Sequence, residues 1–336
     1  MFFLRAIQYK EATSIGDATS LFIHQIDEAE RLNDLCVSKK SRAVGAVIGL
    51  AVGDAVGTTV EFRPRGSFAP LTDMVGGGPF GLEPGQWTDD TSMALCLAES
   101  LLANQGLNER DLMDRFVRWW RQGENSSTGR CFDIGNATRE ALARYERTGD
   151  PLAGNSDPQS AGNGSLMRLS PVAVFFHARP EAAKEIARRH SATTHAAPTA
   201  IDACAYFAEL IVGAIRGDSK EEVLASRDTS SEPEIAAIAA GMWRAKDREE
   251  IRSSGYVVHT LEAAIWTVDR TRSFEEAVLT AANLGDDADT VAAVTGQLAG
   301  ALYGSDAIPE KWRTRLAWSD RIEALSAELF AAGRGL

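Results

Sequence analysis

The sequence predicts an all-α protein: a compact helical bundle with an N-terminal extension. Apolar residues recur at helical spacing through much of the 336-residue chain, above all after Pro180. The sequence lacks the alternating apolar and polar runs that are typical of strands. Small residues stand at many expected helix contacts, and only residues 36–41 look like a linker. We therefore expect an extension over residues 1–37 and one helical domain over residues 38–336.

The extension carries many apolar residues for so short a segment. Phe2, Phe3 and Leu4 open it, and residues 18–35 place apolar side chains at helical spacing with acidic residues between them. One interpretation is a helix packed on the domain. The other is an arm that docks on a partner protein.

The next segment, residues 42–57, is rich in glycine, alanine and valine. Its glycines recur at every fourth position: Gly45, Gly49, Gly53 and Gly57. This stripe predicts a buried helix that lies very close to its neighbours. Glu61 follows in an apolar setting, either as a surface acid paired with Arg63 or Arg65 or as part of a site.

Further helices are expected along the rest of the chain. Their ranges are 92–103, 109–121, 136–147, 180–190, 196–216, 220–226, 232–244, 257–269, 273–282, 290–303 and 309–332. Glycine and proline mark loops over residues 64–86 and 149–164. The second loop runs into Gly162-Asn163-Gly164, and bare backbone N–H groups before a helix can bind a phosphate.

Two acidic clusters stand out. One is Gly85-Gln86-Trp87-Thr88-Asp89-Asp90-Thr91-Ser92-Met93, and the other is Gly285-Asp286-Asp287-Ala288-Asp289-Thr290. Thr88 or Asp89 could simply cap a helix, with the second acid favoured by the helix dipole. The recurrence favours a second interpretation, because clusters of Asp and Thr oxygens suit hard cations such as Mg²⁺ or Mn²⁺. Facing each other, the clusters could hold metal between them.

Composition excludes several classes of function. The net charge of −12 disfavours nucleic acid and anionic membranes as general partners. The four cysteines show no C-x-x-C spacing, which argues against a zinc site and favours a reducing, cytoplasmic compartment. No uninterrupted apolar run reaches about 18 residues, so no transmembrane helix is expected. No Gly-x-Ser-x-Gly motif indicates a serine hydrolase, and His195 could be a local hydrogen-bonding cap.

Four segments taken in order resemble the ADP-ribosylglycohydrolase family, which includes the dinitrogenase-reductase-activating glycohydrolases. They are residues 49–57 with Glu61-Phe62, Trp87-Thr88-Asp89-Asp90-Thr91, residues 162–168, and residues 285–290. The resemblance spans roughly residues 40–305. It implies an all-helical fold and a site for two Mg²⁺ or Mn²⁺ ions with Glu61 beside it. The implied metal ligands are Thr88, Asp89, Asp90, Asp287, Asp289 and Thr290.

Residues 130–136 and 255–260 resemble segments of the arginine-specific bacterial members. This implies a hydrolase that removes ADP-ribose from arginine side chains of modified proteins. The implied substrate contacts are Asp133, Asn136, Asn163, Gly164, Ser165, His195 and Tyr256. Some family members with an added N-terminal segment are immunity proteins, so residues 1–37 could bind an ADP-ribosyltransferase toxin.

The chemistry fits the residue types. An N-glycosidic bond breaks through an oxocarbenium-like transition state, and carboxylates can serve as general base and general acid. Glu61, Asp90 and Asp133 are the candidates, with their individual roles open. Two other classes stay open: a non-catalytic protein that binds ADP-ribose or a partner, and a metal-dependent phosphohydrolase. The non-catalytic class would be favoured if an acid of either cluster were missing, and none is. Product analysis separates the phosphohydrolase, which would release inorganic phosphate or AMP in place of free ADP-ribose.

Overall fold

The computed structural model of the chain describes residues 37–227 and 232–335. Within these ranges the ordered elements are helices, and β-pairing is limited to isolated bridges such as Gly162 with Tyr256. The predicted all-α fold is therefore confirmed. The predicted helix over residues 18–35 lies outside the described residues, and the unit over residues 38–336 is described by itself.

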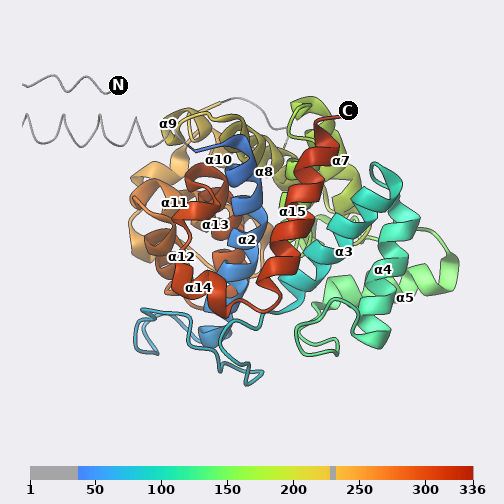
Figure 1. Cartoon of the computed structure of the whole chain (residues 1–336), viewed down its shortest axis with the longest axis horizontal. Coiled ribbons are helices and arrows are strands. Elements are labelled where there is room, and N and C mark those ends of the chain that lie inside the picture. The colour runs from blue at the N-terminus through green and yellow to red at the C-terminus, as the bar shows by residue number, and fades with distance from the viewer. Residues whose placement is uncertain (1–36, 228–231, 336) are drawn as a thin grey trace, which may run out of the picture. The chain divides into compact units, whose positions relative to one another are not determined.

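The helices follow one another with short 3₁₀ turns between several of them (Figure 1). Their bounds are α2 Lys39–Gly57, α3 Asp89–Asn104, α4 Glu109–Gln122, α5 Asn136–Thr148, α6 Ser170–Phe175, α7 Pro180–Ala192, α8 Pro198–Arg216, α9 Lys220–Val223, α10 Pro233–Ala239, α11 Val257–Arg270, α12 Phe274–Ala282, α13 Ala288–Tyr303, α14 Glu310–Arg315 and α15 Ser319–Gly333.

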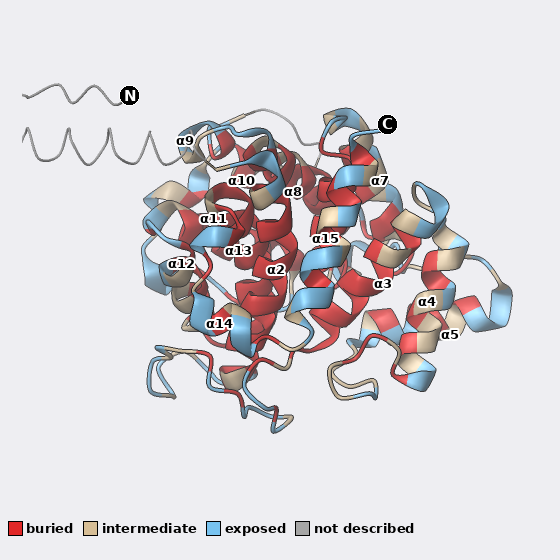
Figure 2. Cartoon of the chain, viewed as in Figure 1, coloured by how far each residue is buried: buried red, intermediate tan, exposed pale blue. Residues whose placement is uncertain are grey.

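Helix α2 lies at the centre and is buried along nearly its whole length (Figure 2). It packs directly against α13, and the glycine stripe explains how closely. A Cβ atom on Gly49 would lie 2.2 Å from the carbonyl oxygen of Gly296, and one on Gly53 would lie 2.1 Å from that of Ala292. The two backbones touch with no side chain between them. The predicted close approach is confirmed.

Two segments that the sequence predicts as continuous helices are each interrupted in the structure. The stretch 309–332 is divided into α14 and α15, because Trp318 adopts a left-handed backbone with φ of 57°. The stretch 232–244 ends as α10 at Ala239, where Gly241 turns the chain with φ of 84° into a 3₁₀ turn. Apolar periodicity continues through both breaks, since the residues on either side pack on the same core.

Two helical stretches are long and apolar enough to cross a membrane by length and composition alone: Lys39–Val60 and Pro198–Arg216. Charges interrupt their apolar runs, which is why counting uninterrupted apolar residues missed them. In the fold, 94% and 78% of their most apolar windows are buried. A core helix of a globular domain passes the same test.

Candidate active site

Helix α3 begins at the first acidic cluster, and its start is organised by a carboxylate from another helix. Asp54 of α2 accepts hydrogen bonds from the backbone N and Oγ1 of Thr88, at 2.8 and 2.9 Å. Its other oxygen accepts from N and Oγ1 of Thr91, at 3.0 and 2.6 Å. The side chain of Thr88 makes no capping bond of its own. Asp54 therefore satisfies the helix start, which leaves Asp89 and Asp90 available for another role.

Helix α13 begins at the second cluster. Gly285 and Asp286 adopt positive φ angles of 76° and 55°, and their turn pairs with the segment after Glu61. Phe62 N donates to the carbonyl oxygen of Asp286 at 2.7 Å, and Asp286 N donates to that of Arg63 at 2.8 Å. This pairing fixes Glu61 next to the start of α13.

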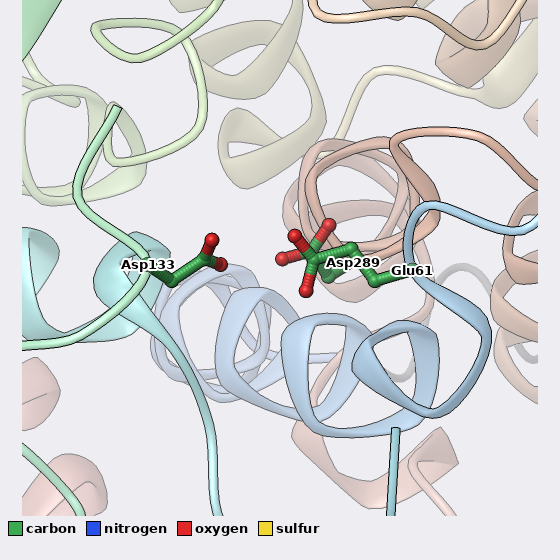
Figure 3. A group of neighbouring side chains, drawn as sticks. All are labelled: Glu61, Asp133 and Asp289. Atoms are coloured by element: carbon green, nitrogen blue, oxygen red, sulfur yellow. The ribbon is translucent and has the colours of Figure 1, made fainter. Parts of the chain in front are cut away.

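The two clusters meet although they are about 200 residues apart in sequence. Thr290 Oγ1 lies 3.4 Å from Asp90 Oδ1, and Thr88 Oγ1 lies 3.4 Å from Asp289 Oδ2. Carboxylate oxygens of Glu61, Asp133 and Asp289 all lie within 4.8 Å of one another. In Figure 3 the Asp133 carboxylate faces those of Glu61 and Asp289 from the opposite side.

Glu61 is not a surface acid, so that interpretation is wrong. Its side chain is 4% exposed, and Oε2 has no hydrogen-bond partner among the described residues. Arg63 and Arg65 instead donate to backbone carbonyl groups, such as those of Ser67 and Leu284. Both arginines are therefore engaged away from the acids.

The acids strongly disfavour one another's charge. Burial, reinforced by Asp133, Asp287 and other acids, raises the pKa of Glu61 to about 10. Burial and the surrounding carboxylates raise the pKa of Asp133 to about 7. The pKa values of Asp89, Asp90 and Asp289 are also raised well above their usual range, again chiefly by burial. A group of carboxylates this close needs protons or cations to neutralise it.

The donor set fits divalent cations. Asp90 Oδ2 and Asp289 Oδ1 join Glu61 Oε2 as buried oxygens without a hydrogen-bond partner in the described chain. Of the residues that the structure describes, no lysine or arginine lines the adjoining cavity. Carboxylate and hydroxyl oxygens are the ligands that Mg²⁺ and Mn²⁺ prefer. The orphaned oxygens and the missing counter-charge are what a hard-cation site requires.

The acids open onto a cavity of about 740 Å³. Carboxylates line it together with the loop Gly162-Asn163-Gly164 and His195, and Asn163 Nδ2 donates to Asp287 Oδ2 at 2.7 Å. Its lining residues are Glu61, Phe62, Asp89, Asp133, Ile134, Gly135, Asn136, Ala137, Thr138, Gly162, Asn163, Gly164, Met167, His195, Ser254, Gly255, Asp286, Asp287, Asp289 and Thr290. A pocket of this size accommodates a nucleotide-sized ligand.

A family model described as ADP-ribosylglycohydrolase matches residues 36–335. This chain belongs to the ADP-ribosylglycohydrolase family. Members of this family are metal-dependent glycohydrolases, in agreement with the buried acidic cluster.

Relatives of known name cover most of the chain. The ADP-ribosylarginine hydrolase Tri1 of Pseudomonas putida (strain GB-1) is 51% identical over 86% of this chain and 78% of its own length. The Tri1 protein of Serratia proteamaculans (strain 568) is 48% identical, with 86% and 79% covered. The ADP-ribosyl-[dinitrogen reductase] glycohydrolase of Rhodospirillum rubrum is 34% identical, with 83% and 91% covered.

A solved structure shares the fold. It is titled an ADP-ribosylglycohydrolase-related protein complex and superimposes with a TM-score of 0.79 at 45% identity, covering 88% of this chain and 99% of the other.

The other residues predicted for the ADP-ribosylglycohydrolase site fall into two groups. Asn136, Asn163, Gly164 and His195 line the cavity. The remaining side chains lie behind it or beside it: Thr88, Asp90, Ser165 and Tyr256. The Ser165 hydroxyl lies 2.8 Å from Ser191 Oγ. Tyr256 donates its hydroxyl to Glu234, while its backbone pairs with Gly162.

Sequence reasoning missed Asp54 as part of the site. It is fully buried and bonded to Thr88 and Thr91, so it positions the cluster from behind. Burial raises its pKa to about 6. An aspartate within an otherwise apolar helix was the available signal, because a buried carboxylate needs hydrogen-bond partners.

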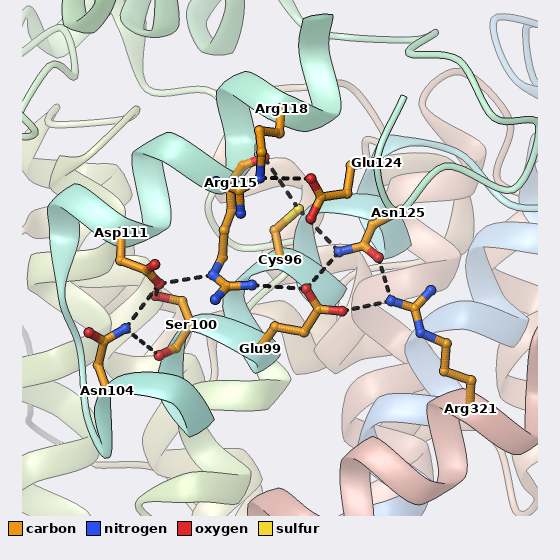
Figure 4. A network of polar contacts seen from close by, with 10 residues as sticks. All are labelled: Cys96, Glu99, Ser100, Asn104, Asp111, Arg115, Arg118, Glu124, Asn125 and Arg321. Atoms are coloured by element: carbon orange, nitrogen blue, oxygen red, sulfur yellow. Dashed lines mark hydrogen bonds and ion pairs between the residues drawn. The ribbon is translucent and has the colours of Figure 1, made fainter. Parts of the chain in front are cut away.

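The loop that carries Asp133 is held at its start by a network of ion pairs and hydrogen bonds. Glu99 of α3 accepts hydrogen bonds from Arg115, Asn125 and Arg321 at 3.1, 3.1 and 2.6 Å (Figure 4). Asn125 stands in this loop with φ of 60°, and Asp133 itself has φ of 59°. Such left-handed conformations cost free energy and persist where neighbours fix them. The network therefore fixes the start of the loop that leads to Asp133.

Proposed function

We propose that this chain is a metal-dependent hydrolase that removes ADP-ribose from arginine side chains of modified proteins. The observation that carries the proposal is the cavity, whose lining in the described part of the chain has six carboxylates and no lysine or arginine. Such a cavity suits a cationic guanidinium group, whereas a serine-linked substrate presents no charge there. The two Tri1 relatives, at 51% and 48% identity, are named for the same activity.

We infer that the cavity holds two divalent cations, Mg²⁺ or Mn²⁺. The ligands in this proposal are Thr88, Asp89, Asp90, Asp287, Asp289 and Thr290, with Glu61 beside them. Three oxygens without partners, on Glu61, Asp90 and Asp289, support this assignment. Bound cations would polarise the substrate and hold the vicinal ribose hydroxyl groups.

The chain's own carboxyl groups handle the protons in this proposal. Water adds to the anomeric carbon of the ribose as the bond from that carbon to the guanidine nitrogen breaks. Glu61 would accept the proton that the water gives up, because bound cations would lower its raised pKa, and Asp133 delivers a proton to the departing nitrogen. Burial raises the pKa of Asp133, which favours the protonated form that this step needs. Bound cations would likewise keep Asp90 ionised among the proposed ligands.

The loop Gly162-Asn163-Gly164 suits the diphosphate. The backbone N–H groups of Gly164 and Ser165 have no hydrogen-bond partner among the described residues, and Gly164 lines the cavity with His195. N–H donors of this kind bind phosphate oxygens well. We propose that Asn136, Asn163 and Tyr256 complete the substrate contacts, with Tyr256 acting from the rim next to Gly255.

The test is product analysis with arginine-ADP-ribosylated protein and, in parallel, the serine-linked form. We expect free ADP-ribose from the arginine substrate and little from the serine substrate. Asp89→Ala and Asp287→Ala should abolish release, while exposed Asp320→Asn should not. AMP or inorganic phosphate as the product would favour a phosphohydrolase. Tight binding without any product would favour a non-catalytic ADP-ribose-binding protein.

We also propose that residues 1–37 bind an ADP-ribosyltransferase toxin, so that the chain acts as an immunity protein. The apolar content of this segment, including Phe2, Phe3 and Phe22, supports a docking role. An Asp89→Ala protein should still bind and block its toxin. A protein that starts near Ser38 should keep hydrolysis and lose binding. If the truncated protein loses hydrolysis, the segment belongs to the catalytic domain and this role is excluded.

A further inference from the structure

Behind His195 lies a buried arginine without a carboxylate partner among the described residues. Arg168 is 0% exposed, and its guanidinium stacks 4.5 Å from the ring centroid of Phe116. Its pKa is lowered to about 10 by burial, which leaves it charged at neutral pH. Its three hydrogen bonds within the described chain go to neutral acceptors: His190 Nε2 at 3.1 Å, Thr194 Oγ1 at 2.8 Å and Met93 Sδ at 3.5 Å.

A guanidinium group can only donate hydrogen bonds, so each of these partners must accept. Thr194 Oγ1 accepts from Arg168 and therefore keeps its own hydrogen for its other neighbour, His195 Nδ1, at 2.8 Å. If Nδ1 carried the ring hydrogen, the threonine hydrogen would have no acceptor among the described residues. The arrangement that gives both contacts of Thr194 Oγ1 a donor and an acceptor makes Nδ1 the acceptor and places the hydrogen on Nε2.

The Nε2 edge of His195 faces the cavity. A Cβ atom built on Gly164 would lie 2.9 Å from Nε2, and one on Gly162 would lie 3.4 Å away. Both glycines and His195 line the cavity. Nε2 has no hydrogen-bond partner in the described parts of the chain. The glycines keep this nitrogen uncovered.

We propose that Arg168 and Thr194 are positioning residues that fix His195 as a neutral ring with its hydrogen on Nε2. His195 then presents one uncharged donor, of constant direction, to an acceptor oxygen of the ADP-ribosyl substrate. This inference rests on the proposed function for the identity of that substrate. The tautomer itself is a property of the free protein.

The same guanidinium fixes a second ring. Because Arg168 donates to His190 Nε2, the hydrogen of His190 lies on Nδ1, which is 3.3 Å from the carbonyl oxygen of Ala187. His190 and His195 should therefore hold opposite tautomers, set by one arginine. This opposition gives the proposal an internal control within a single spectrum.

The experiment is long-range ¹H–¹⁵N NMR of the full chain labelled at histidine, with signals assigned through His195→Asn and His190→Asn. We expect Nε2–H for His195 and Nδ1–H for His190 in the parent protein. Thr194→Val should mix or reverse the His195 tautomer, and Thr194→Ser should restore it. Nδ1–H for His195 in the parent would overturn the proposal, whatever the enzyme hydrolyses.

Kinetics supply the second readout. Thr194→Val should raise KM for the modified protein by roughly tenfold, the effect of one misdirected hydrogen bond. Thr194→Ser should stay within about twofold of the parent. The matched control is Thr193→Val. It removes a buried hydroxyl that donates to the carbonyl oxygen of His190 at 2.7 Å and does not contact Arg168 or the His195 ring. Equal effects of the two valine variants on KM and on the His195 signal would overturn the proposal. A correct tautomer in an enzyme that acts on another linkage would instead refute only the proposed function.

Discussion

At the scale of single residues, Asp54 shows how one carboxylate can organise a site that it does not line. One of its oxygens accepts hydrogen bonds from Thr88 and the other accepts from Thr91. The start of α3 is therefore held to α2 from inside the core. The acids that follow Thr88 are then directed toward those of α13. Removing the acceptor capacity of Asp54 should therefore disturb both stability and hydrolysis.

We expect Asp54→Asn to lower the free energy of unfolding by about 2–4 kcal/mol, because an amide group leaves buried donors without an acceptor. Hydrolysis should fall by at least about tenfold as Asp89 loses its position. Urea unfolding and an ADP-ribose release assay measure the two effects. Asp320→Asn, on the exposed face of α15, is the control and should change stability by less than about 0.5 kcal/mol. A fully stable, fully active Asp54→Asn protein would contradict this account.

Buried histidines should make stability depend on pH. Burial and the charge of Arg168 lower the pKa of His195 to about 3, and burial also lowers the pKa of His190. The unfolded chain protonates these rings near pH 6.5. Their contribution to stability is therefore complete above about pH 6.5 and is lost as the pH falls from there toward about 3.

The measurement is the free energy of unfolding from pH 7.5 to pH 5 in saturating Mg²⁺. Each neutral buried ring should add a slope of up to about 1.4 kcal/mol per pH unit on the acid side. His195→Asn should remove one such contribution. Identical slopes in the parent and in the variant would show that His195 takes up a proton in the folded state.

At the scale of elements, the contact between α2 and α13 sets the distance between the two acidic clusters. The glycine stripe brings these backbones together. The first cluster, at the start of α3, is bound to α2 through Asp54, and the second stands at the start of α13. Any group inserted between them must push them apart, because interiors are closely packed.

We expect Gly49→Ala to lower the free energy of unfolding by about 1–3 kcal/mol, although alanine favours helices. The added Cβ would meet the Gly296 carbonyl oxygen at 2.2 Å. Gly335→Ala adds a Cβ whose nearest neighbour is 3.6 Å away, so it should be close to neutral. Thermal unfolding compares them. A stabilised Gly49→Ala protein would contradict the close approach.

The local sequence pattern predicted where the helices lie better than it predicted where they are interrupted. The four-residue glycine period predicted the close contact of α2, because it depends only on side-chain size along one helix face. The breaks at Gly241 and Trp318 depend on tertiary packing that selects a left-handed backbone. For tryptophan this conformation is rare, so no local propensity could predict it.

For the site, too, the sequence predicted what depends on local pattern and missed what depends on long-range contacts. The two acidic clusters could be recognised from residue type and recurrence, and the structure brings them together. The burial of Glu61 depends on the pairing of its neighbours with Asp286, which is a long-range contact. The hydrogen bonds that link Arg168 through Thr194 to His195 also depend on three-dimensional proximity, which a single sequence does not show.

At the scale of the whole molecule, helices from distant parts of the chain converge to make one acidic cavity. α2 supplies Asp54 and ends near Glu61, α3 supplies Asp89 and Asp90, and α13 supplies Asp289. Folding must assemble all of these before the cluster exists. The repulsion among the acids opposes that assembly, and cations would relieve it.

The central claim is that these converged acids hold divalent cations on which the release of ADP-ribose from arginine depends. The most direct measurement follows Mn²⁺ binding by calorimetry and ADP-ribose release in the same metal-stripped samples. We expect the stripped protein to be folded and inactive, and activity to return in step with the binding of two cations per chain. Asp287→Ala should lose both signals. Full release of ADP-ribose by protein shown to contain no bound cation would contradict the claim.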